Sequence, residues 1–475
     1  MNFNPALVVP EIYFLAMILV LLLQSLGARR VRLPVQRWVI LAAAIGFVLT
    51  LTSFGARGTM FWKVYRLDAM SQFFKAVIAF GFLAAVANAA HQPTLEEGKR
   101  ADYFMFLGFS SLGLMILASS VELIAMYLAL ELSAYSLYAV IPLRARDPRA
   151  AEAAVKYILF GAVATALSLY GLSYIMAVQH TTYVTELAKH TWAFAQVPMA
   201  VVGLSLFLAG MFYKLALFPF HFWAPDVYQG ASNETAAYVA TLPKMGAVVI
   251  LVRLAAMLKP GLEITTILAV LGAVSMTYGN FAALAQKDLK RLLGFSSVAH
   301  AGYVMVGLVA GTALGLAAAA FYAMAYLLMN LLCFWVISRV AVDGRNLEFA
   351  DLNGLYKRAP ALAFSLAAGA FALVGLPPTV GFIGKFFLIT AAWNQGYNWL
   401  VVILVVNSAI AIYYYLSLVR HAYTEDKTPE AAPLPDTRAF SLVGAGLLAA
   451  VVLLLGIVPA PVFEFAVRAG TSLLP

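Results

Sequence analysis

The chain has 475 residues, of which 63% are hydrophobic and only 11% are charged, and its mean hydropathy is +0.88. Soluble domains carry about 25% charged residues, so this composition excludes a protein whose whole surface faces water. The single cysteine, Cys333, excludes an intramolecular disulfide and a thiolate-bound zinc or iron–sulfur site within the chain. Neither an HExxH motif nor a glycine-rich phosphate loop occurs, so no metal or nucleotide site is expected. The sequence therefore predicts an all-α polytopic membrane protein.

Long uncharged runs divide the chain into about fourteen predicted transmembrane helices, because one crossing takes about 20 apolar residues. They fall near residues 8–26, 38–56, 69–90, 103–120, 122–142, 152–178, 197–218, 235–258, 264–285, 290–309, 313–338, 359–392, 399–420 and 439–463. Residues 292–338 contain no Asp, Glu, Lys or Arg and are too long for one crossing, so we divide them between Gly307 and Gly315. The first run lacks the basic start and the cleavage site of a secretory signal, and we interpret it as the first span.

The formal net charge of +9 is explained by topology, without a nucleic-acid partner. The loops after odd-numbered predicted spans hold most of the loop lysines and arginines, and the positive-inside rule assigns such loops to the cytoplasm. Both termini are therefore predicted outside. The basic loop residues include Arg29, Arg30, Arg32, Arg146 and Lys427 on the cytoplasmic side and Lys259 on the other side.

Two predicted spans are interrupted by proline, the seventh at Pro219 and the twelfth at Pro377 and Pro378. They lie five helices apart, and a duplication with an odd offset inverts the second copy. Paired interrupted helices in an inverted repeat indicate a transport site near the middle of the membrane, although prolines are also simply common in membrane helices. The predicted divisions are a three-helix segment (1–95), two inverted five-helix repeats (helices 4–8, 101–258; helices 9–13, 264–421) and a C-terminal helix (436–475).

Four ionisable residues inside the predicted spans are the main candidates for function, because a charge at the centre of a bilayer costs about 2.5–3.5 kcal/mol on insertion scales. Glu131 lies in mid-span, with Tyr127 and Tyr135 four residues to either side. Lys214 lies one turn before the first proline break. The other two candidates are Lys244, which follows Pro243 deep in its span, and Lys385, which follows the second break. The alternatives are a protonated structural glutamate and lysines whose charged heads extend to the interface.

Three further residues are accessory candidates. Lys156 follows Glu152 by four residues, and a helical ion pair between them would account for it as well as a functional role. His300 has Ser296, Ser297 and Tyr303 beside it on one helical face, which suits bound water, but a lone histidine is often only a satisfied core residue. His221, near Pro219, is a weaker candidate. We interpret Lys75 as a lysine whose stem extends to the interface.

This polar inventory favours protons over metal ions. Burial disfavours the charged form of both lysine and glutamate, so buried groups of the two kinds can exchange protons. A carboxylate that approaches a buried ammonium stabilises the charge, and its withdrawal favours release of the proton. A sodium site needs several oxygen ligands, and lysines would repel the ion. The sequence therefore predicts a proton relay.

The chain resembles the antiporter-like membrane subunits of respiratory complex I, the proton-translocating NADH:quinone oxidoreductase, and among these the bacterial N type. The matching stretches are LALELSAYSLY (128–138), EAAVKYILFG (152–161), KLALFPFHFWAPDVYQGA (214–231), QKDLKRLLGFSSVAHAGY (286–303) and GLPPTVGFIGKF (375–386). Each stretch is moderately specific, and the ordered set is highly specific. Lys385 stands where M-type subunits carry a glutamate, and the lateral helix of L-type subunits is absent, which favours the N type.

The resemblance implies roles for the candidates in a multi-pass protein of the bacterial inner membrane with periplasmic termini. Glu131 would pair with Lys214 in one half-channel, with Lys156 as an accessory partner. Lys244 would form the central relay, Lys385 would lie in the half-channel that leads outside, and His300 would line the hydrated axis. The resemblance implies no cofactor in this chain, with FMN and iron–sulfur clusters on partner subunits. The implied partners are membrane subunits of the M, K and J types, together with lipid.

Two other functions remain open from the sequence. The same module occurs in multi-chain Na⁺/H⁺ antiporters and membrane-bound hydrogenases, which sodium dependence or a hydrogenase partner would reveal. A scaffold that only holds its neighbours together is the other alternative, although buried lysines and broken helices are costly features for a scaffold.

Overall fold

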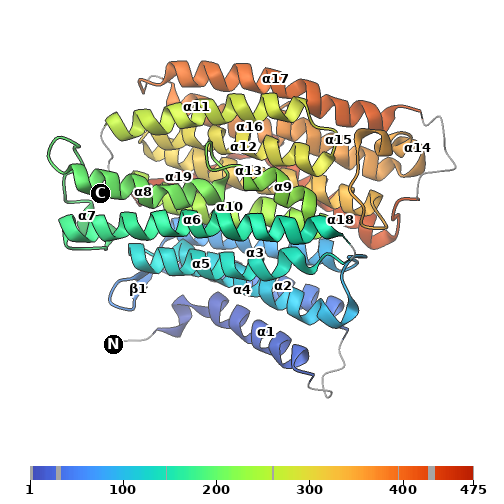
Figure 1. Ribbon diagram of the computed structural model, residues 1–475, viewed down its shortest axis with the longest axis horizontal. Helices are drawn as coiled ribbons and strands as arrows, with labels where there is room; N and C mark the ends of the chain where they lie inside the picture. Colours follow the sequence, from blue (N-terminus) through green and yellow to red (C-terminus); the bar gives the residue numbers. More distant parts are fainter. Residues whose placement is uncertain are drawn as a thin grey trace.

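The structure is a computed structural model that describes residues 4–27, 34–145, 147–258, 262–393, 395–425 and 434–473. The basic loop residues Arg29, Arg30, Arg32, Arg146, Lys259 and Lys427 lie outside these ranges. The helices run side by side along the long axis, and both ends of the described chain lie at the same end of the bundle (Figure 1). This arrangement agrees with an even number of crossings, and the orientation of the termini remains a prediction.

The helices of the N-terminal half follow the predicted spans closely. Their bounds are α1 Val9–Ser25, α2 Val35–Thr52, α3 Ala69–Ala89, α4 Arg100–Ser119, α5 Leu123–Val140, α6 Pro148–Gln179, α7 Val184–Leu187, α8 Pro198–Leu215, α9 Trp223–Gly230 and α10 Asn233–Leu258. The second half contains α11 Leu262–Leu284, α12 Leu289–Val309, α13 Ala313–Val340, α14 Leu355–Arg358, α15 Pro360–Val374, α16 Val380–Ala392, α17 Asn398–Tyr423, α18 Ala439–Ile457 and α19 Ala460–Thr471. Short 3₁₀ turns are η1 Pro5–Leu7, η2 Glu97–Lys99, η3 Ile141–Leu143 and η4 Phe349–Leu352.

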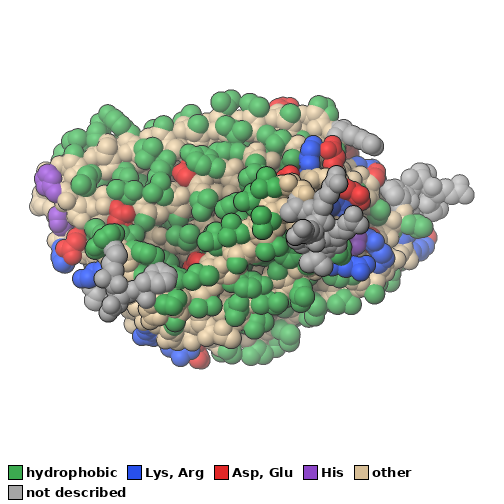
Figure 2. Space-filling view, turned by 90° about the horizontal axis from the view of Figure 1, so that it is seen from below, with side chains coloured by type: hydrophobic (Ala, Val, Ile, Leu, Met, Phe, Trp, Pro, Cys, Tyr) green, Lys and Arg blue, Asp and Glu red, His purple; other side chains and the backbone are tan. Residues whose placement is uncertain are grey.

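Twelve helices in the described residues are long and apolar enough to cross a membrane. The shorter apolar helix α1 and the pair α15 and α16 complete the predicted set of about fourteen spans. Hydrophobic side chains cover most of the middle of the visible face, whereas lysines and arginines lie mainly toward the two ends (Figure 2). This distribution fits a belt of lipid around the middle of the bundle.

Two differences from the predicted spans have local causes. The last span ends at Ile457 instead of continuing to residue 463, and the separate helix α19 follows. Pro459 has no N–H to donate to a continuing helix, so the chain breaks there. A two-stranded hairpin, β1 Gly58–Met60 with β2 Tyr65–Leu67, was not predicted. Its apolar side chains cover Leu7 and Val8 at the start of the chain.

Both predicted helix breaks are confirmed. The seventh span consists of α8 and α9, and α8 ends where Ala216 adopts a left-handed conformation with φ of 61°. The twelfth span consists of α15 and α16, and α15 ends at Gly375, whose φ of 87° suits a residue without a Cβ. Around these breaks α10, α12 and α13 are almost completely buried, whereas α2, α6 and α18 leave much of their surface to lipid. Of the candidate relay, these buried helices carry Lys244 on α10 and His300 on α12.

Candidate proton-relay site

The first break leaves Lys214 in an aromatic pocket. Lys214 lies in the last turn of α8, is 4% exposed, and its Nζ has no hydrogen-bond partner. Its Nζ lies over three tyrosine rings, at 5.1 Å from the centroid of Tyr213, 5.5 Å from Tyr157 and 5.9 Å from Tyr138. Aromatic faces attract a cation without accepting a conventional hydrogen bond. The pocket can therefore hold the ammonium, but it stabilises the charge less than a carboxylate in contact would.

Glu131 lies on α5 and is also buried. Its Oε1 accepts a hydrogen bond of 3.0 Å from Thr165 Oγ1, and its Oε2 has no partner. It therefore makes no direct hydrogen bond to the unpartnered Lys214, although the two groups interact electrostatically. The pairing implied by the resemblance is thus not a contact in this structure.

Two tyrosine hydroxyls lie close to one glycine of α6 in the surroundings of Lys214. A Cβ at Gly161 on α6 would lie 2.2 Å from the Tyr138 hydroxyl and 3.3 Å from the Tyr213 hydroxyl. The Tyr213 hydroxyl also donates a hydrogen bond of 2.8 Å to the Tyr157 carbonyl oxygen. Because residue 161 has no side chain, both hydroxyls reach the same point on α6 beside Lys214.

Lys244 is the central member of the site. It is 2% exposed and follows Pro243 within α10. Its Nζ donates a hydrogen bond of 3.0 Å to the carbonyl oxygen of Leu215 and a second one to Ser297 Oγ. Leu215 is the last residue of α8, so the helix break supplies a carbonyl that a continuous helix would use internally. The break therefore creates the binding position for this ammonium.

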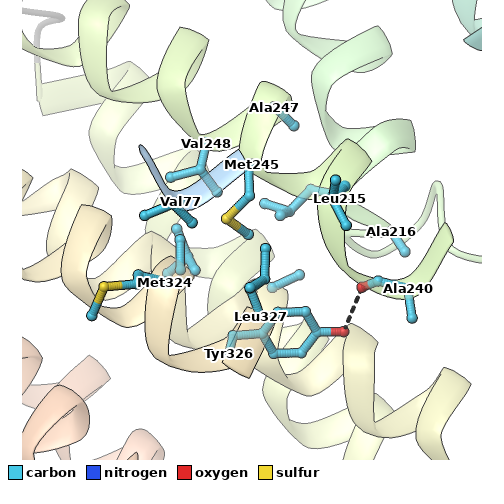
Figure 3. Close-up of a cluster of buried hydrophobic side chains, with 14 of the residues drawn as sticks. Val77, Leu215, Ala216, Ala240, Met245, Ala247, Val248, Met324, Tyr326 and Leu327 are labelled. Atoms are coloured by element: carbon cyan, nitrogen blue, oxygen red, sulfur yellow. Dashed lines mark hydrogen bonds between the residues drawn. The ribbon is translucent and has the colours of Figure 1, made fainter. Parts of the chain in front are cut away.

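Apolar side chains enclose the region around Lys244. Leu215, Met245, Val248 and Tyr326 line a gap beside it. They belong to a cluster of buried side chains in which the Tyr326 hydroxyl donates a hydrogen bond of 3.2 Å to the Ala240 carbonyl oxygen (Figure 3). A cavity of about 10 Å³ lies between Lys244 and His300. This volume is near the smallest that holds one water molecule. The surroundings thus provide a low dielectric and a small gap beside Lys244 and His300.

His300 connects the hydroxyl groups beyond this cavity. Its Nδ1 lies 2.8 Å from the Tyr322 hydroxyl and its Nε2 lies 3.2 Å from the Tyr415 hydroxyl. Tyr415 also shares a hydrogen bond with Ser296 on the helix that carries His300. A neutral imidazole has one donor and one acceptor nitrogen. His300 can therefore accept a proton on one side and donate one on the other.

Lys385 occupies the second break. It is 5% exposed, and its Nζ donates hydrogen bonds of 2.8 Å to the Val374 carbonyl oxygen and 3.0 Å to Ser408 Oγ. Val374 is the last residue of α15, so the acceptor again comes from the end of a half-helix. The ammonium also lies 4.4 Å from the Tyr303 ring centroid, and Tyr303 lies beside His300. Lys385 thus continues the polar series that begins at Lys214.

The accessory candidates have different environments. Lys156 forms the predicted ion pair with Glu152 at 2.7 Å and a second one with Asp226 at 2.6 Å, and its side chain is 37% exposed. The structure therefore joins Lys156 to α9 rather than to Glu131. His221 lies in the first break with both ring nitrogens buried and unpartnered, against the Phe222 and Tyr278 rings. It makes no hydrogen bond to the other members of the series.

Several buried charges were not recognised in the sequence. Lys75 is 1% exposed and forms an ion pair of 2.5 Å with Glu11, so its interpretation as a lysine that extends to the interface is wrong. Lys290 and Glu234 are 0% and 1% exposed, although the sequence places both next to predicted loops. The start of an apolar run does not reveal which face of its first turn is buried. The only feature of the sequence that pointed to the burial of Glu234 was its position directly before a predicted span.

The fold and the site define a polytopic membrane protein in which buried lysines, tyrosines and a histidine form a polar series through the helix bundle. The family model described as "NADH:quinone oxidoreductase/Mrp antiporter, TM" matches residues 120–411. The chain belongs to this family of membrane subunits.

Individual relatives cover almost the whole chain. NADH-quinone oxidoreductase subunit N 2 of Solidesulfovibrio magneticus is 60% identical over 468 residues, which are 98% of each chain. F(420)H(2) dehydrogenase subunit N of Methanosarcina mazei is 34% identical and covers 90% of this chain and 89% of its own. A chain of respiratory complex I from Thermus thermophilus has a TM-score of 0.84 and 31% identity, over 96% of this chain and 99% of its own. The Mrp complex from Dietzia sp. contains a chain with a TM-score of 0.86 at 20% identity, a likeness in fold, which covers 99% of this chain and 98% of its own.

Proposed function

We propose that the chain is the N-type membrane subunit of a proton-translocating NADH:quinone oxidoreductase, in which redox work in partner subunits drives protons through the buried residues described above. The observation that carries the proposal is the Lys244 ammonium, bound to the Leu215 carbonyl oxygen at 3.0 Å and to Ser297 between two other buried lysines. The 60% identity to a subunit N over 98% of both chains supports the N type. The 20% identity to the Mrp chain supports only the shared fold.

In this proposal Glu131 and Lys214 form the first station of the relay. Movement of the Glu131 carboxylate toward Lys214 stabilises the ammonium, and its withdrawal leaves that charge with tyrosine faces alone. The proton then passes toward Lys244, whose acceptor Leu215 directly follows Lys214 in the chain. Like charges at neighbouring sites repel in a low dielectric. Protonation of one lysine therefore favours release of the proton from the other lysine.

From Lys244 the proposed path continues to the second break. Ser297 and the small cavity lead to His300, whose two hydroxyl partners lie on α13 and α17. Lys385 is the last station, stabilised by the Val374 carbonyl oxygen and Ser408. We assign accessory positions to Lys156 and His221. We also propose that helices 4–8 and 9–13 (101–258 and 264–421) are inverted repeats, so that the two breaks serve opposite sides of the membrane.

The proposed assembly places FMN and iron–sulfur clusters on other subunits and M-, K- and J-type subunits and lipid beside this chain. The proposed location is the bacterial inner membrane with periplasmic termini. The test is purification of the complex from its native membrane, followed by reconstitution in vesicles and measurement of NADH oxidation and proton movement together.

Lys244→Met is the decisive variant, with Lys189→Met as its matched control because the Lys189 side chain is 68% exposed. We expect the Lys244 variant to assemble and to move fewer protons per NADH oxidised, whereas the control behaves as the wild type. Unchanged proton movement in Lys244→Met would favour a scaffold. Sodium-driven transport without NADH-oxidising partners would favour an antiporter subunit.

A further inference from the structure

A second group of buried charges lies at the end of the bundle where α9 ends and α10 begins. We name it the α9-end cluster, and it consists of Arg144, Glu234, Lys290 and Arg339. Glu234 is 1% exposed, and neither of its carboxylate oxygens has a hydrogen-bond partner. Lys290 and Arg339 are 0% and 2% exposed. None of these residues belongs to the series from Glu131 to Lys385.

Backbone carbonyls hold the cations of this cluster. Lys290 Nζ donates a hydrogen bond of 2.6 Å to the Ala231 carbonyl oxygen, and Arg144 donates bonds of 3.2 Å to the carbonyl oxygens of Gly230 and Ala231. Arg339 donates a hydrogen bond of 3.3 Å to the Asn88 carbonyl oxygen. These contacts fix the cations at the C-terminal end of α9 and nearby, without using Glu234 as an acceptor.

Burial and the nearby cations act on the Glu234 carboxylate in opposite directions. A buried ionised carboxylate without a donor is costly, which favours the protonated acid. Arg339, Lys290 and Arg144 act on Glu234 electrostatically and favour the ionised form. A group in this position can accept and release a proton as the charge on a nearby site changes.

One member of the cluster, Arg144, lines a cleft at the end of the bundle. A polar cleft of about 640 Å³ is lined by Arg144, Asp147, Gly344, Arg345 and other loop residues. Arg144 donates a hydrogen bond of 3.0 Å to the Gly344 carbonyl oxygen at the cleft wall. Asn233, the residue before Glu234, donates one of 3.3 Å to the Arg345 carbonyl oxygen. The cleft thus reaches the residues that contact the start of α10.

On its other side the cluster leads to Lys244. Lys290 and Ser297 lie two turns apart on the same face of α12. Ser297 Oγ lies 3.2 Å from the Tyr228 hydroxyl and accepts the hydrogen bond from Lys244. Glu234 precedes Lys244 by ten residues on α10, a rise of about 15 Å at 1.5 Å per residue. The hydroxyls of Ser297 and Tyr228 therefore extend from Lys244 onto α9, the helix whose end the cluster contacts.

We infer that Glu234 is a proton-loading group that takes protons from the cleft and supplies them to Lys244, an inference that rests on the proposed function. The carboxylate takes a proton from a hydronium ion, so that an O–H bond forms and a water molecule remains in the cleft. That O–H bond then breaks, and the hydroxyls of Tyr228 and Ser297 each gain one proton and give up another. The neutral amine of Lys244 gains the N–H bond.

The experiment uses the whole complex in vesicles and compares Glu234→Gln, Glu234→Asp and the exposed control Glu464→Gln with Lys244→Met. We expect Glu234→Gln to reduce the protons moved per NADH oxidised as far as Lys244→Met does. Glu234→Asp should restore at least half of the wild-type value, because it retains a carboxylate. Glu464→Gln should behave as the wild type. Because Gln removes the charge together with the proton site, Tyr228→Phe is added, which keeps the charge of Glu234 and removes one hydroxyl of the route.

Each outcome separates the inference from the proposed function. Full proton movement in Glu234→Gln together with loss in Lys244→Met overturns the loading role and leaves the proposed function intact. Full movement in both variants overturns both. If neither Glu234 variant assembles, Glu234 is structural and the inference fails. If only Glu234→Asp assembles, Tyr228→Phe decides between the two outcomes. Full proton movement in Tyr228→Phe overturns the route, and reduced proton movement supports it.

Discussion

The Lys244 ammonium donates a hydrogen bond of 3.0 Å to the carbonyl oxygen of Leu215, the last residue of α8. The same relationship occurs at the second break, where Lys385 donates one of 2.8 Å to the carbonyl oxygen of Val374, the last residue of α15. The C-terminal end of a helix carries a partial negative charge and free carbonyl oxygens. Each break thus provides an acceptor for a lysine inside the membrane.

Lys244→Arg tests whether the lysine at the first break is a relay or only a helix cap. Arginine can still donate to the Leu215 carbonyl oxygen, but its guanidinium does not lose a proton in proteins. We expect the variant complex to assemble, oxidise NADH and lose proton movement to the same extent as Lys244→Met. The measurement is proton movement per NADH in vesicles, and wild-type movement would show that a fixed charge is sufficient.

Gly161→Ala tests the opening beside Lys214. The added Cβ would lie 2.2 Å from the Tyr138 hydroxyl, so the tyrosine must move away from α6. We expect proton movement to fall several-fold in an assembled complex, because Tyr138 lies in the aromatic pocket of Lys214. Gly446→Ala is the matched control, since a Cβ there meets nothing within 4 Å. Equal activity of the two variants would contradict a role for the tyrosine hydroxyl.

The number of spans and the two breaks could be predicted from the sequence because both are local properties. The length of an apolar run determines a crossing, and Pro219 and Pro377 each remove a backbone N–H from helical hydrogen bonding. Proline alone does not determine a break, since α10 continues through Pro243. The burial of Lys214, Lys244 and Lys385 could also be predicted, since each lies far from the nearest charged loop. Their hydrogen-bond partners could not, because the carbonyl at each break becomes an acceptor only when another segment packs against it.

Charges near the ends of predicted spans were the main source of error. Lys75 pairs with Glu11, and Arg253 binds Asp68 with hydrogen bonds of 2.9 and 3.0 Å, so each pair joins helices that are distant in the sequence. Hydropathy treats such residues as the polar edge of a span. Only the three-dimensional packing of α1, α3 and α10 decides that they are buried. The burial of Glu234 could not be predicted for the same reason.

The Lys75–Glu11 pair gives a prediction about stability. Glu11 is 7% exposed and lies 2.5 Å from Lys75 Nζ, so Glu11→Gln leaves a buried ammonium without its counter-charge. Removal of one partner of a buried pair costs about 3–5 kcal/mol. We expect a lower unfolding temperature in a thermal melt of the purified complex, with little change in protons moved per NADH by the folded fraction. The double variant Glu11→Gln/Lys75→Met should recover most of the loss, and failure to recover would assign the effect to something other than the charge.

Asp436, in the loop before α18, gives a prediction about pH. Hydrogen bonds from the Arg438 side chain, together with the Ser441 hydroxyl and the Arg438 backbone N–H, outweigh burial and hold the pKa of this carboxyl below its ordinary value. A lowered pKa in the folded state contributes stability above the unfolded pKa of about 3.9, and this contribution is lost as the pH falls toward the folded pKa. Asp436→Asn should therefore lower the melting temperature at pH 7 and pH 5 by a similar amount, consistent with a loss of about 1 kcal/mol, the typical net contribution of one hydrogen bond to stability. The difference from the wild type should shrink below about pH 4, and a constant difference down to pH 3 would show that the ionised carboxylate is not the stabilising form.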